Sequence, residues 1–122
     1  MVADALNSAK KPINGSRIHL FGIAYKRDVS DMRESPALDI LELLVRRGAL
    51  ASYTDPYVSE LQHGGHSYKS IPFEMFNGAN CDCAVVTTDH SSFDYRRIAA
   101  LPLVVDTRNA LKGPPTATVF KL

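Results

Sequence analysis

Residues 35–53 read SPALDILELLVRRGALASY, a stretch that predicts an amphipathic helix followed at once by a strand. Ser35 is a suitable N-cap, and Pro36 suits the first helical position. Apolar residues then recur at i, i+3, i+4 and i+7 and form one face of the helix: Ala37, Ile40, Leu41 and Leu44. Gly48 ends the helix, and residues 49–53 have the composition of a short strand.

Strands and helices alternate on both sides of this stretch. Residues 17–23 (RIHLFGI) predict a strand before the helix, and the apolar runs at 82–87 and 103–106 are typical of buried parallel strands. Weaker helices are predicted at 72–77 and 92–99. Such alternation predicts an α/β fold, namely a Rossmann-like three-layer sandwich with a mostly parallel sheet and helices on both faces.

Three other segments are less regular. Residues 3–9 resemble the end of a helix, and a break rich in turn-forming residues follows. We therefore expect residues 1–14 to be the end of a linker helix and a connector, cut from a longer protein, and residues 15–122 to be the domain. A natural N-terminal helix that frays is the alternative. Residues 57–71 are expected to form a loop with a short helix and a small strand, and residues 114–122 to be partly extended.

Size and composition exclude several classes of protein. A chain of 122 residues suits one small domain. The net charge of +1 at pH 7 gives no electrostatic signal for nucleic acid or for an anionic membrane. No apolar run approaches the roughly 18 residues of a spanning helix, and the first residues lack a signal-peptide pattern. We expect a cytoplasmic protein with no membrane and no nucleic-acid partner.

Charged residues gather where a ligand would bind in such a fold, beyond the carboxyl ends of the strands. The loop at residues 25–36 (YKRDVSDMRESP) is the densest polar stretch, and it precedes a helix N-terminus, where anions bind well. Lys26 offers a point charge for a phosphate and Arg33 a planar fork. Arg108 follows the last predicted buried strand. A solvated, charge-balanced surface loop explains the residues of this loop equally well.

The glycines that would cradle a dinucleotide are missing. The first strand ends in Gly22-Ile23-Ala24, with no second or third glycine in register. This unit is therefore not expected to hold NAD in the usual way, although its fold class commonly does.

The two cysteines do not indicate a catalytic or a metal site. Cys81 and Cys83 lie two residues apart at the start of a strand, so their side chains are expected to share one face and to pack in the core. Two thiols are too few ligands for a structural metal.

The histidines are also weak signals. His63 and His66 flank a Gly-Gly pair and are expected to be solvated loop residues rather than a metal pair. His19 is expected to be packed or hydrogen-bonded within its strand. His90 is expected to position backbone at the ligand edge, and no residue of this chain is expected to be catalytic.

Four motifs occur in a specific order. They are GIAYK at 22–26, DMRESP at 31–36, DPY at 55–57 and VDTRN at 105–109. Together they resemble the C-terminal domain of the UDP-glucose/GDP-mannose dehydrogenase family, over about residues 15–112. Residues 87–95 (TTDHSSFDY) are similar to members that act on UDP-N-acetylhexosamines, whereas UDP-glucose enzymes tend to carry a Glu-Trp pair near this point and this chain has no Trp.

The resemblance implies an activity and a set of site residues. Family members oxidise the C6 alcohol of a nucleotide sugar to a carboxylate with two NAD⁺. An N-terminal domain binds NAD, a cysteine in that half forms the covalent thiohemiacetal, and the C-terminal domain clamps the nucleotide diphosphate. By resemblance, Tyr25 and Lys26 line the sugar-nucleotide site, Arg33 reaches the cofactor, and Arg108 contacts the nucleotide end of the substrate.

On this interpretation the chain is the substrate-binding domain of an NAD-dependent UDP-sugar 6-dehydrogenase of polysaccharide biosynthesis, and it is inactive alone. Its partners are the UDP-sugar and the N-terminal NAD-binding domain, and the full-length protein is expected to form homo-oligomers. The main alternative is a stand-alone nucleotide-binding or regulatory α/β module. A third interpretation is a flavodoxin-like or other small α/β domain in which the motifs are coincidental.

Overall fold

The computed structural model describes residues 2–9, 11–24, 28, 35–111 and 118–121. Within them, five parallel strands form one sheet in the order β2-β1-β5-β6-β7. The strands are β1 (Arg17–Phe21), β2 (Leu50–Thr54), β5 (Cys83–Val86), β6 (Val104–Asp106) and β7 (Val119–Lys121). The predicted parallel sheet is confirmed, and β7 supplies the extended structure expected near the C-terminus.

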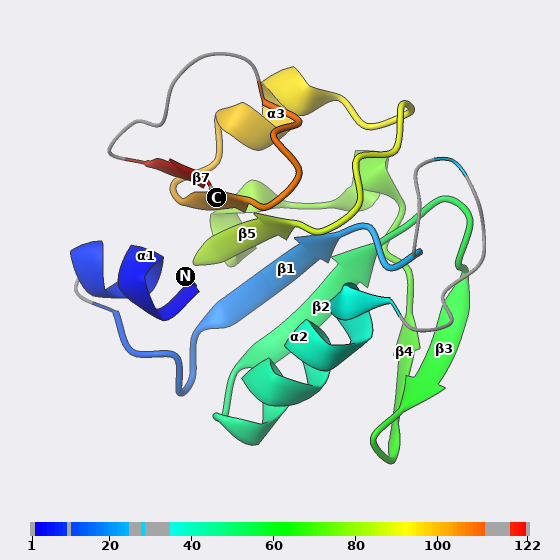
Figure 1. Ribbon diagram of the computed structural model, residues 1–122, viewed down its shortest axis with the longest axis horizontal. Coiled ribbons are helices and arrows are strands. Elements are labelled where there is room, and N and C mark those ends of the chain that lie inside the picture. Colours follow the sequence, from blue (N-terminus) through cyan, green and yellow to red (C-terminus); the bar gives the residue numbers. More distant parts are fainter. Residues whose placement is uncertain (1, 10, 25–27, 29–34, 112–117, 122) are drawn as a thin grey trace.

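Helices cover both faces of this sheet, as Figure 1 shows. On one side lie α1 (Val2–Ser8) and α2 (Pro36–Arg46), and on the other lie α3 (Tyr95–Ala99) and the single 3-10 turns η1 (Phe73–Met75) and η2 (Gly78–Asn80). The predicted three-layer sandwich is therefore confirmed.

The strand residues alternate between the two cores, as the pleat requires. Residues facing α1 and α2 include Ile18, Leu20, Cys83, Val85 and Val105. Residues facing α3 and η1 include Phe21, Ala84, Val86 and Val104. Most of these side chains are fully buried because the middle strands of the sheet are covered on both faces.

The predicted helix signals hold in α2. Ser35 Oγ accepts the Ala37 amide at 3.2 Å, and Pro36 occupies the first helical position. The residues Ala37, Leu41 and Leu44 are buried. The chain leaves the helix through Gly48 at φ +86°, a conformation that glycine adopts without steric cost.

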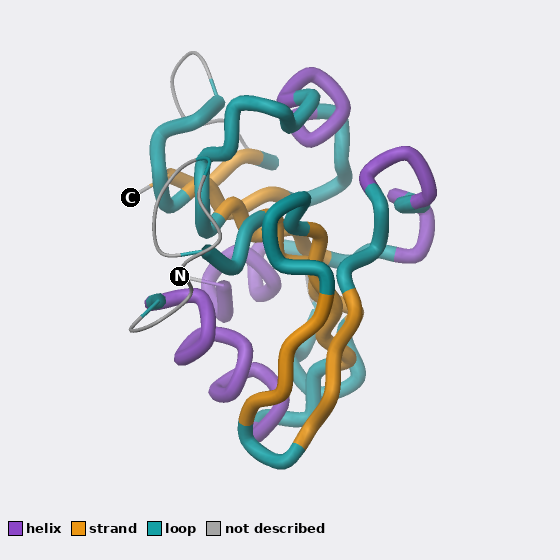
Figure 2. The backbone as a smooth tube through the Cα atoms, turned by 90° about the vertical axis from the view of Figure 1, so that its right-hand side faces the viewer, coloured by secondary structure: helices purple, strands orange, loops and turns teal. Residues whose placement is uncertain are grey.

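Residues 57–71 differ from the expectation. They form an antiparallel hairpin, β3 (Glu60–His63) and β4 (His66–Lys69), and no helix. Gly64 and Gly65 both have positive φ, 59° and 80°, which suits the two-residue turns that match strand twist. The hairpin lies alongside α2 (Figure 2), where His63 Nε2 comes 3.4 Å from Glu42 Oε2.

The expectation that Cys81 and Cys83 share one face is wrong. Cys83 packs in the core under α1 and α2, whereas Cys81 packs in the core under α3. Cys81 precedes β5 and follows η2, so the strand alternation does not apply to it. Both thiols are buried, as expected.

The N-terminal helix packs on the sheet rather than standing apart. Ala5 and Leu6 are fully buried in the same core as α2. The proposed division of the chain after residue 14 stays a prediction. No helix in the described part of the chain combines the length and the apolar character needed to cross a membrane.

Candidate functional site

The sheet topology creates one natural place for a ligand. β1 connects through α2 to β2 on one side, and β5 connects through α3 to β6 on the other. Where neighbouring parallel strands send their connections in opposite directions, a crevice forms at their carboxyl ends. Here these strands are β1 and β5, whose arrowheads point to the same side in Figure 1.

The segments that follow β1 and β5 meet at Gly22. Its φ is +99°, and a Cβ atom there would lie only 2.7 and 2.8 Å from the backbone N and O of Thr88. Thr88 Oγ1 donates to the Ala24 carbonyl at 2.6 Å, and Thr87 Oγ1 is within hydrogen-bond distance of the Phe21 and Gly22 carbonyls. Glycine is required here because the two backbones approach too closely for a side chain.

A buried carboxylate holds the first residues of the β1 loop. Asp55 directly follows β2 and is 1% exposed. Its Oδ2 accepts the amides of Ile23 at 2.7 Å and Ala24 at 2.9 Å, and its Oδ1 accepts the Tyr57 amide at 2.8 Å. Burial alone would raise the pKa of Asp55, but hydrogen bonds from His90 and these amides outweigh it and lower the pKa. Asp55 is therefore an ionised anchor.

His90 connects this carboxylate to the loop. Its ring is fully buried, and its Nε2 lies 2.9 Å from Asp55 Oδ2. Its Nδ1 accepts the Asp28 backbone amide at 2.8 Å. The ring of Tyr57 lies against it, with centroids 4.9 Å apart. The expectation that His90 positions backbone at the ligand edge is confirmed.

Asp28 is held by the β5 loop. Its carboxylate accepts the Ser91 amide through Oδ1 and the Ser91 hydroxyl through Oδ2, both at 2.8 Å. Its φ of +59° is left-handed, which is unusual for a residue other than glycine. Residues 28, 55 and 90 thus form one connected network at the switch point of the sheet.

The start of α2 satisfies its own donors. Ser35 Oγ donates to the Ile23 carbonyl at 2.7 Å while it caps Ala37, and the Leu38 amide donates to the Ser35 carbonyl at 3.1 Å. Pro36 has no amide hydrogen. The helix amides that could have bound an anion near Ser35 are therefore already used, and Ser35 instead closes the base of the β1 loop.

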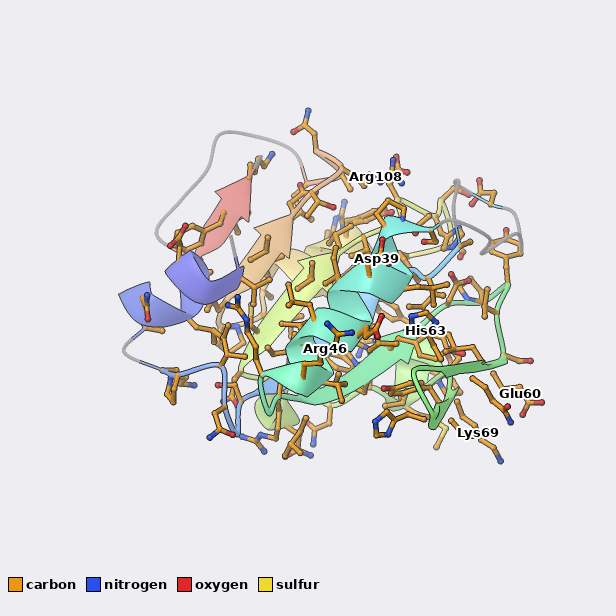
Figure 3. The ribbon with its side chains drawn as sticks, turned by 60° about the horizontal axis from the view of Figure 1, so that its bottom comes forward. Asp39, Arg46, Glu60, His63, Lys69 and Arg108 are labelled. Carbon is orange, nitrogen blue, oxygen red and sulfur yellow. The ribbon has the colours of Figure 1, made fainter. Side chains whose placement is uncertain are left out.

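Arg108 lies at the same edge, after β6. Its Nε donates to the Thr87 carbonyl at 3.0 Å, which draws the side chain toward the β5 loop. The carboxylate of Asp106 holds the backbone that follows β6. It accepts hydrogen bonds from three backbone amides, those of Arg108 at 3.1 Å, Ala110 at 3.0 Å and Leu111 at 2.9 Å. In Figure 3, Arg108 lies toward the Asp39 end of α2 and away from Arg46 at the other end.

The structure describes one of the four predicted site residues. It places Arg108 beside the β5 loop at the carboxyl ends of the strands, and its contact with the substrate stays a prediction. Tyr25, Lys26 and Arg33 lie outside the described residues. Sequence reasoning gave Asp28 no anchoring role and gave Asp55 none beyond membership of a motif. The sequence signal for the anchoring role of Asp55 is its place directly after a strand and before Pro56.

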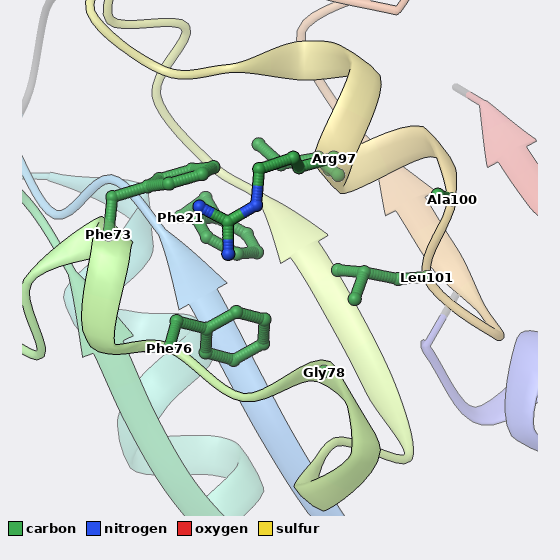
Figure 4. A pocket seen from close by; sticks show the side chains of 8 residues that line it. Phe21, Phe73, Phe76, Gly78, Arg97, Ala100 and Leu101 are labelled. Carbon is green, nitrogen blue, oxygen red and sulfur yellow. The ribbon is translucent and has the colours of Figure 1, made fainter.

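A separate pocket of about 260 Å³ opens between α3 and residues 73–80, on the face opposite α2 (Figure 4). It is lined largely by apolar side chains, among them Phe21, Phe76 and Leu101. The guanidinium carbon of Arg97 lies 4.8 Å from the centroid of the Phe73 ring. Arg108, the one predicted substrate-binding residue that the structure describes, does not line this pocket.

The described thiols and histidines form no reactive or metal-binding group. Burial raises the pKa of Cys81 to about 11 and that of Cys83 to about 12. No cluster of three or more His, Cys, Asp or Glu side chains that could hold a metal ion occurs among the residues described. His19 is buried between Ser52 Oγ, 2.6 Å from Nδ1, and Thr54 Oγ1, 2.7 Å from Nε2, as expected for a packed strand residue.

Comparison with known proteins identifies relatives. Residues 19–113 match the UDP binding domain of the UDP-glucose/GDP-mannose dehydrogenase family. The chain is similar to a UDP-N-acetyl-D-mannosamine dehydrogenase from Methanococcus maripaludis, with 37% identity over 69% of this chain and 18% of that protein. It is also similar to a UDP-glucose 6-dehydrogenase from Rhizobium meliloti, with 32% identity over 86% of this chain and 26% of that protein.

A solved structure is similar over almost the whole chain. It is that of a UDP-D-ManNAc dehydrogenase from Pyrococcus horikoshii, with a TM-score of 0.75 and 28% identity over 98% of this chain and 28% of that one. The chain therefore spans less than a third of the length of each of these relatives.

Proposed function

We propose that this chain, which belongs to the UDP-glucose/GDP-mannose dehydrogenase family through its UDP binding domain, binds the diphosphate of a UDP-sugar at the carboxyl ends of β1 and β5. One observation carries the proposal: the segments after β1, β5 and β6 converge at the switch point, and Arg108 is held there by Thr87. A guanidinium at this position suits a phosphate, because its planar donors match two oxygens at once.

Lys26 and Tyr25 complete the proposed site by resemblance. Lys26 would supply a second positive charge, and Tyr25 would line the sugar nucleotide. We propose a UDP-N-acetylhexosamine as the substrate. Residues 87–95 support this choice, as does the similarity to UDP-N-acetyl-D-mannosamine dehydrogenases, although UDP-glucose 6-dehydrogenases are among the relatives too.

The described residues do not fit an NAD cradle at the end of β1. In a dinucleotide fold, glycines there let a pyrophosphate approach the backbone. Here the open side of Gly22 faces Thr88, whose backbone atoms would lie 2.7 and 2.8 Å from a Cβ. We therefore propose that NAD is bound mainly by an N-terminal domain of a longer protein, with Arg33 reaching it across the domain cleft.

The thiol for covalent catalysis is proposed to lie in that same N-terminal part. Cys81 and Cys83 are buried with raised pKa values, so neither is a nucleophile at neutral pH. The chain alone should then produce no NADH from NAD⁺ and UDP-sugars. Measurable turnover by these 122 residues would refute the assignment of the thiol to another domain.

Isothermal titration with UDP, UDP-N-acetylglucosamine and GDP tests the binding proposal. Arg108→Ala and Lys26→Ala should each weaken UDP binding by about 1.5–3 kcal/mol, the range for a hydrogen bond to a charged group, or roughly 10- to 150-fold. Arg17→Ala is the matched control, because Arg17 begins β1 at the opposite edge of the sheet and pairs there with Asp82. Equal effects of Arg108→Ala and Arg17→Ala would contradict the proposal.

A further inference from the structure

We infer that His90 is a positioning residue for the proposed substrate site, fixing the β1 loop at Asp28 through a single imidazole tautomer that Asp55 maintains. The inference rests on the proposed function in one respect, namely that this loop contributes Lys26 to binding. The contacts themselves are independent of it. They run from Asp55 Oδ2 to His90 Nε2 over 2.9 Å, and from His90 Nδ1 to the Asp28 amide over 2.8 Å.

The partners of the ring select one tautomer. A backbone amide can only donate, so His90 Nδ1 must accept from Asp28, and the proton of a neutral ring must sit on Nε2. That proton then points at the carboxylate of Asp55, which accepts it. In the other tautomer the proton would sit on Nδ1 and point at the N–H of Asp28. The unprotonated Nε2 would then face the carboxylate of Asp55, and neither contact would be a hydrogen bond.

This arrangement excludes proton transfer by His90. The ring is fully buried, and both of its nitrogens are engaged by the protein. A general acid or base must reach the proton that it moves. His90 therefore acts through the backbone that it holds.

The held backbone is in the left-handed region. Asp28 has φ +59°, an uncommon conformation that aspartate adopts more readily than most residues with a Cβ. The amide of Asp28 is bonded to His90, and its carboxylate accepts both the amide and the hydroxyl of Ser91. His90 and Ser91, in the loop after β5, thus hold the backbone of the loop after β1 at Asp28.

Fixing this point matters for ligand binding because Lys26 is two residues away in the sequence. Two residues of chain span at most about 7 Å, so we expect a change at the Asp28 backbone to affect diphosphate binding through Lys26. Because Asp28 is already held beside Ser91, its own backbone does not have to be ordered when a diphosphate binds. Loss of the support should therefore weaken UDP binding without removing any group that touches UDP.

Two substitutions at the same position separate positioning from general stability. In His90→Gln, the side-chain amide can reach Asp55 as Nε2 does, but the acceptor for Asp28 is lost. In His90→Asn, the side-chain oxygen can replace Nδ1 as acceptor for Asp28, but the donor to Asp55 is lost. A merely structural histidine would make the two variants alike in binding once their stabilities are taken into account.

The measurements are amide hydrogen exchange at Asp28 and Ser91 by NMR, and UDP affinity by calorimetry. His90→Gln should expose the Asp28 amide to rapid exchange and weaken UDP binding about tenfold, whereas His90→Asn should keep the amide protected and bind within about threefold of wild type. Ser91→Ala, an exposed position that does not threaten folding, should raise exchange at Asp28 and weaken binding by about two- to fivefold.

The outcomes distinguish this inference from the proposed function. Two results would overturn the positioning role of His90. One is that the Asp28 amide of the wild type exchanges as fast as an unprotected amide, and the other is that this amide exchanges equally fast in His90→Gln and His90→Asn. If the wild type binds no UDP while Asp28 protection follows the expected order, the loop is positioned by His90 and the proposed function fails. If Asp28 protection follows that order but His90→Gln binds UDP as wild type does, positioning does not serve the ligand and the inference is overturned.

Discussion

Replacing Gly22 by alanine should destabilise the fold at the junction of the β1 and β5 loops. Two costs add. A side chain at φ +99° is strained by about 1–2 kcal/mol, and the new Cβ would lie 2.7 and 2.8 Å from the Thr88 backbone, well inside normal contact distance. Backbone atoms cannot move aside as a flexible side chain can, so overpacking adds about 1–3 kcal/mol. The expected loss of unfolding free energy is about 2–5 kcal/mol.

Gly15 provides a matched control for the Gly22 substitution. It also has positive φ, +81°, but apart from its two chain neighbours no described residue lies within 4 Å of a Cβ placed there. Gly15→Ala should therefore cost only the conformational part, about 1–2 kcal/mol. Urea unfolding of the two variants and the wild type, monitored by circular dichroism, gives the difference directly.

Equal losses in the two glycine variants would refute the reasoning, because they would mean that the loops are not in contact at Gly22. A second readout follows from the position of Thr88, two residues before His90. Gly22→Ala should also raise hydrogen exchange at the Asp28 amide, whereas Gly15→Ala should leave it unchanged.

Three further outcomes follow from other buried groups. Burial lowers the pKa of His19 to about 3, so as the pH falls below the ordinary value of 6.5 the unfolded state binds a proton before the folded state does. Between pH 7 and 4.5 the unfolding free energy of the wild type should therefore drop by roughly 2–3 kcal/mol more than that of His19→Gln. A difference between the two proteins that does not change with pH would contradict this. Ser35→Ala should cost about 1–2 kcal/mol in urea unfolding, because it removes the cap on Ala37 and the closure of the β1 loop; a loss below 0.5 kcal/mol would argue against the cap. With pKa values of about 11 and 12, Cys81 and Cys83 should react with a disulfide reagent at pH 8 only after urea is added, and rapid native labelling would show that the thiols are accessible.

Local signals in the sequence predicted the fold well. The cap at Ser35, the apolar face of α2 and the buried runs of β5 and β6 are each encoded within about a dozen residues, and each was found. For residues 57–71 the sequence predicts a small strand and a short helix rather than a hairpin, because the strands of the hairpin are short, polar and poor in β-branched residues. Its recognisable signal was the Gly64-Gly65 pair between two runs of equal length.

The site could be predicted only in part, for a physical reason. The place of Arg108 at the carboxyl ends of the strands could be predicted, because it follows a buried parallel strand and parallel strands all end at the same edge of the sheet. The network of Asp28, Asp55 and His90 joins residues 35 and 62 positions apart in the chain. Their partners are set by how the loops pack, and no periodic pattern in one sequence encodes that. Buried polar groups must find partners, but the sequence alone does not say which.

NMR mapping of UDP on the labelled 122-residue chain tests most directly whether a nucleotide diphosphate binds at the carboxyl ends of β1 and β5. Addition of UDP should shift the amide signals of Ala24, Thr88 and Arg108, which lie at that edge, and leave Leu50 and Asp82, at the opposite edge, unchanged. Shifts centred on Leu50 and Asp82, or on the pocket between α3 and residues 73–80, with none at Arg108, would contradict it.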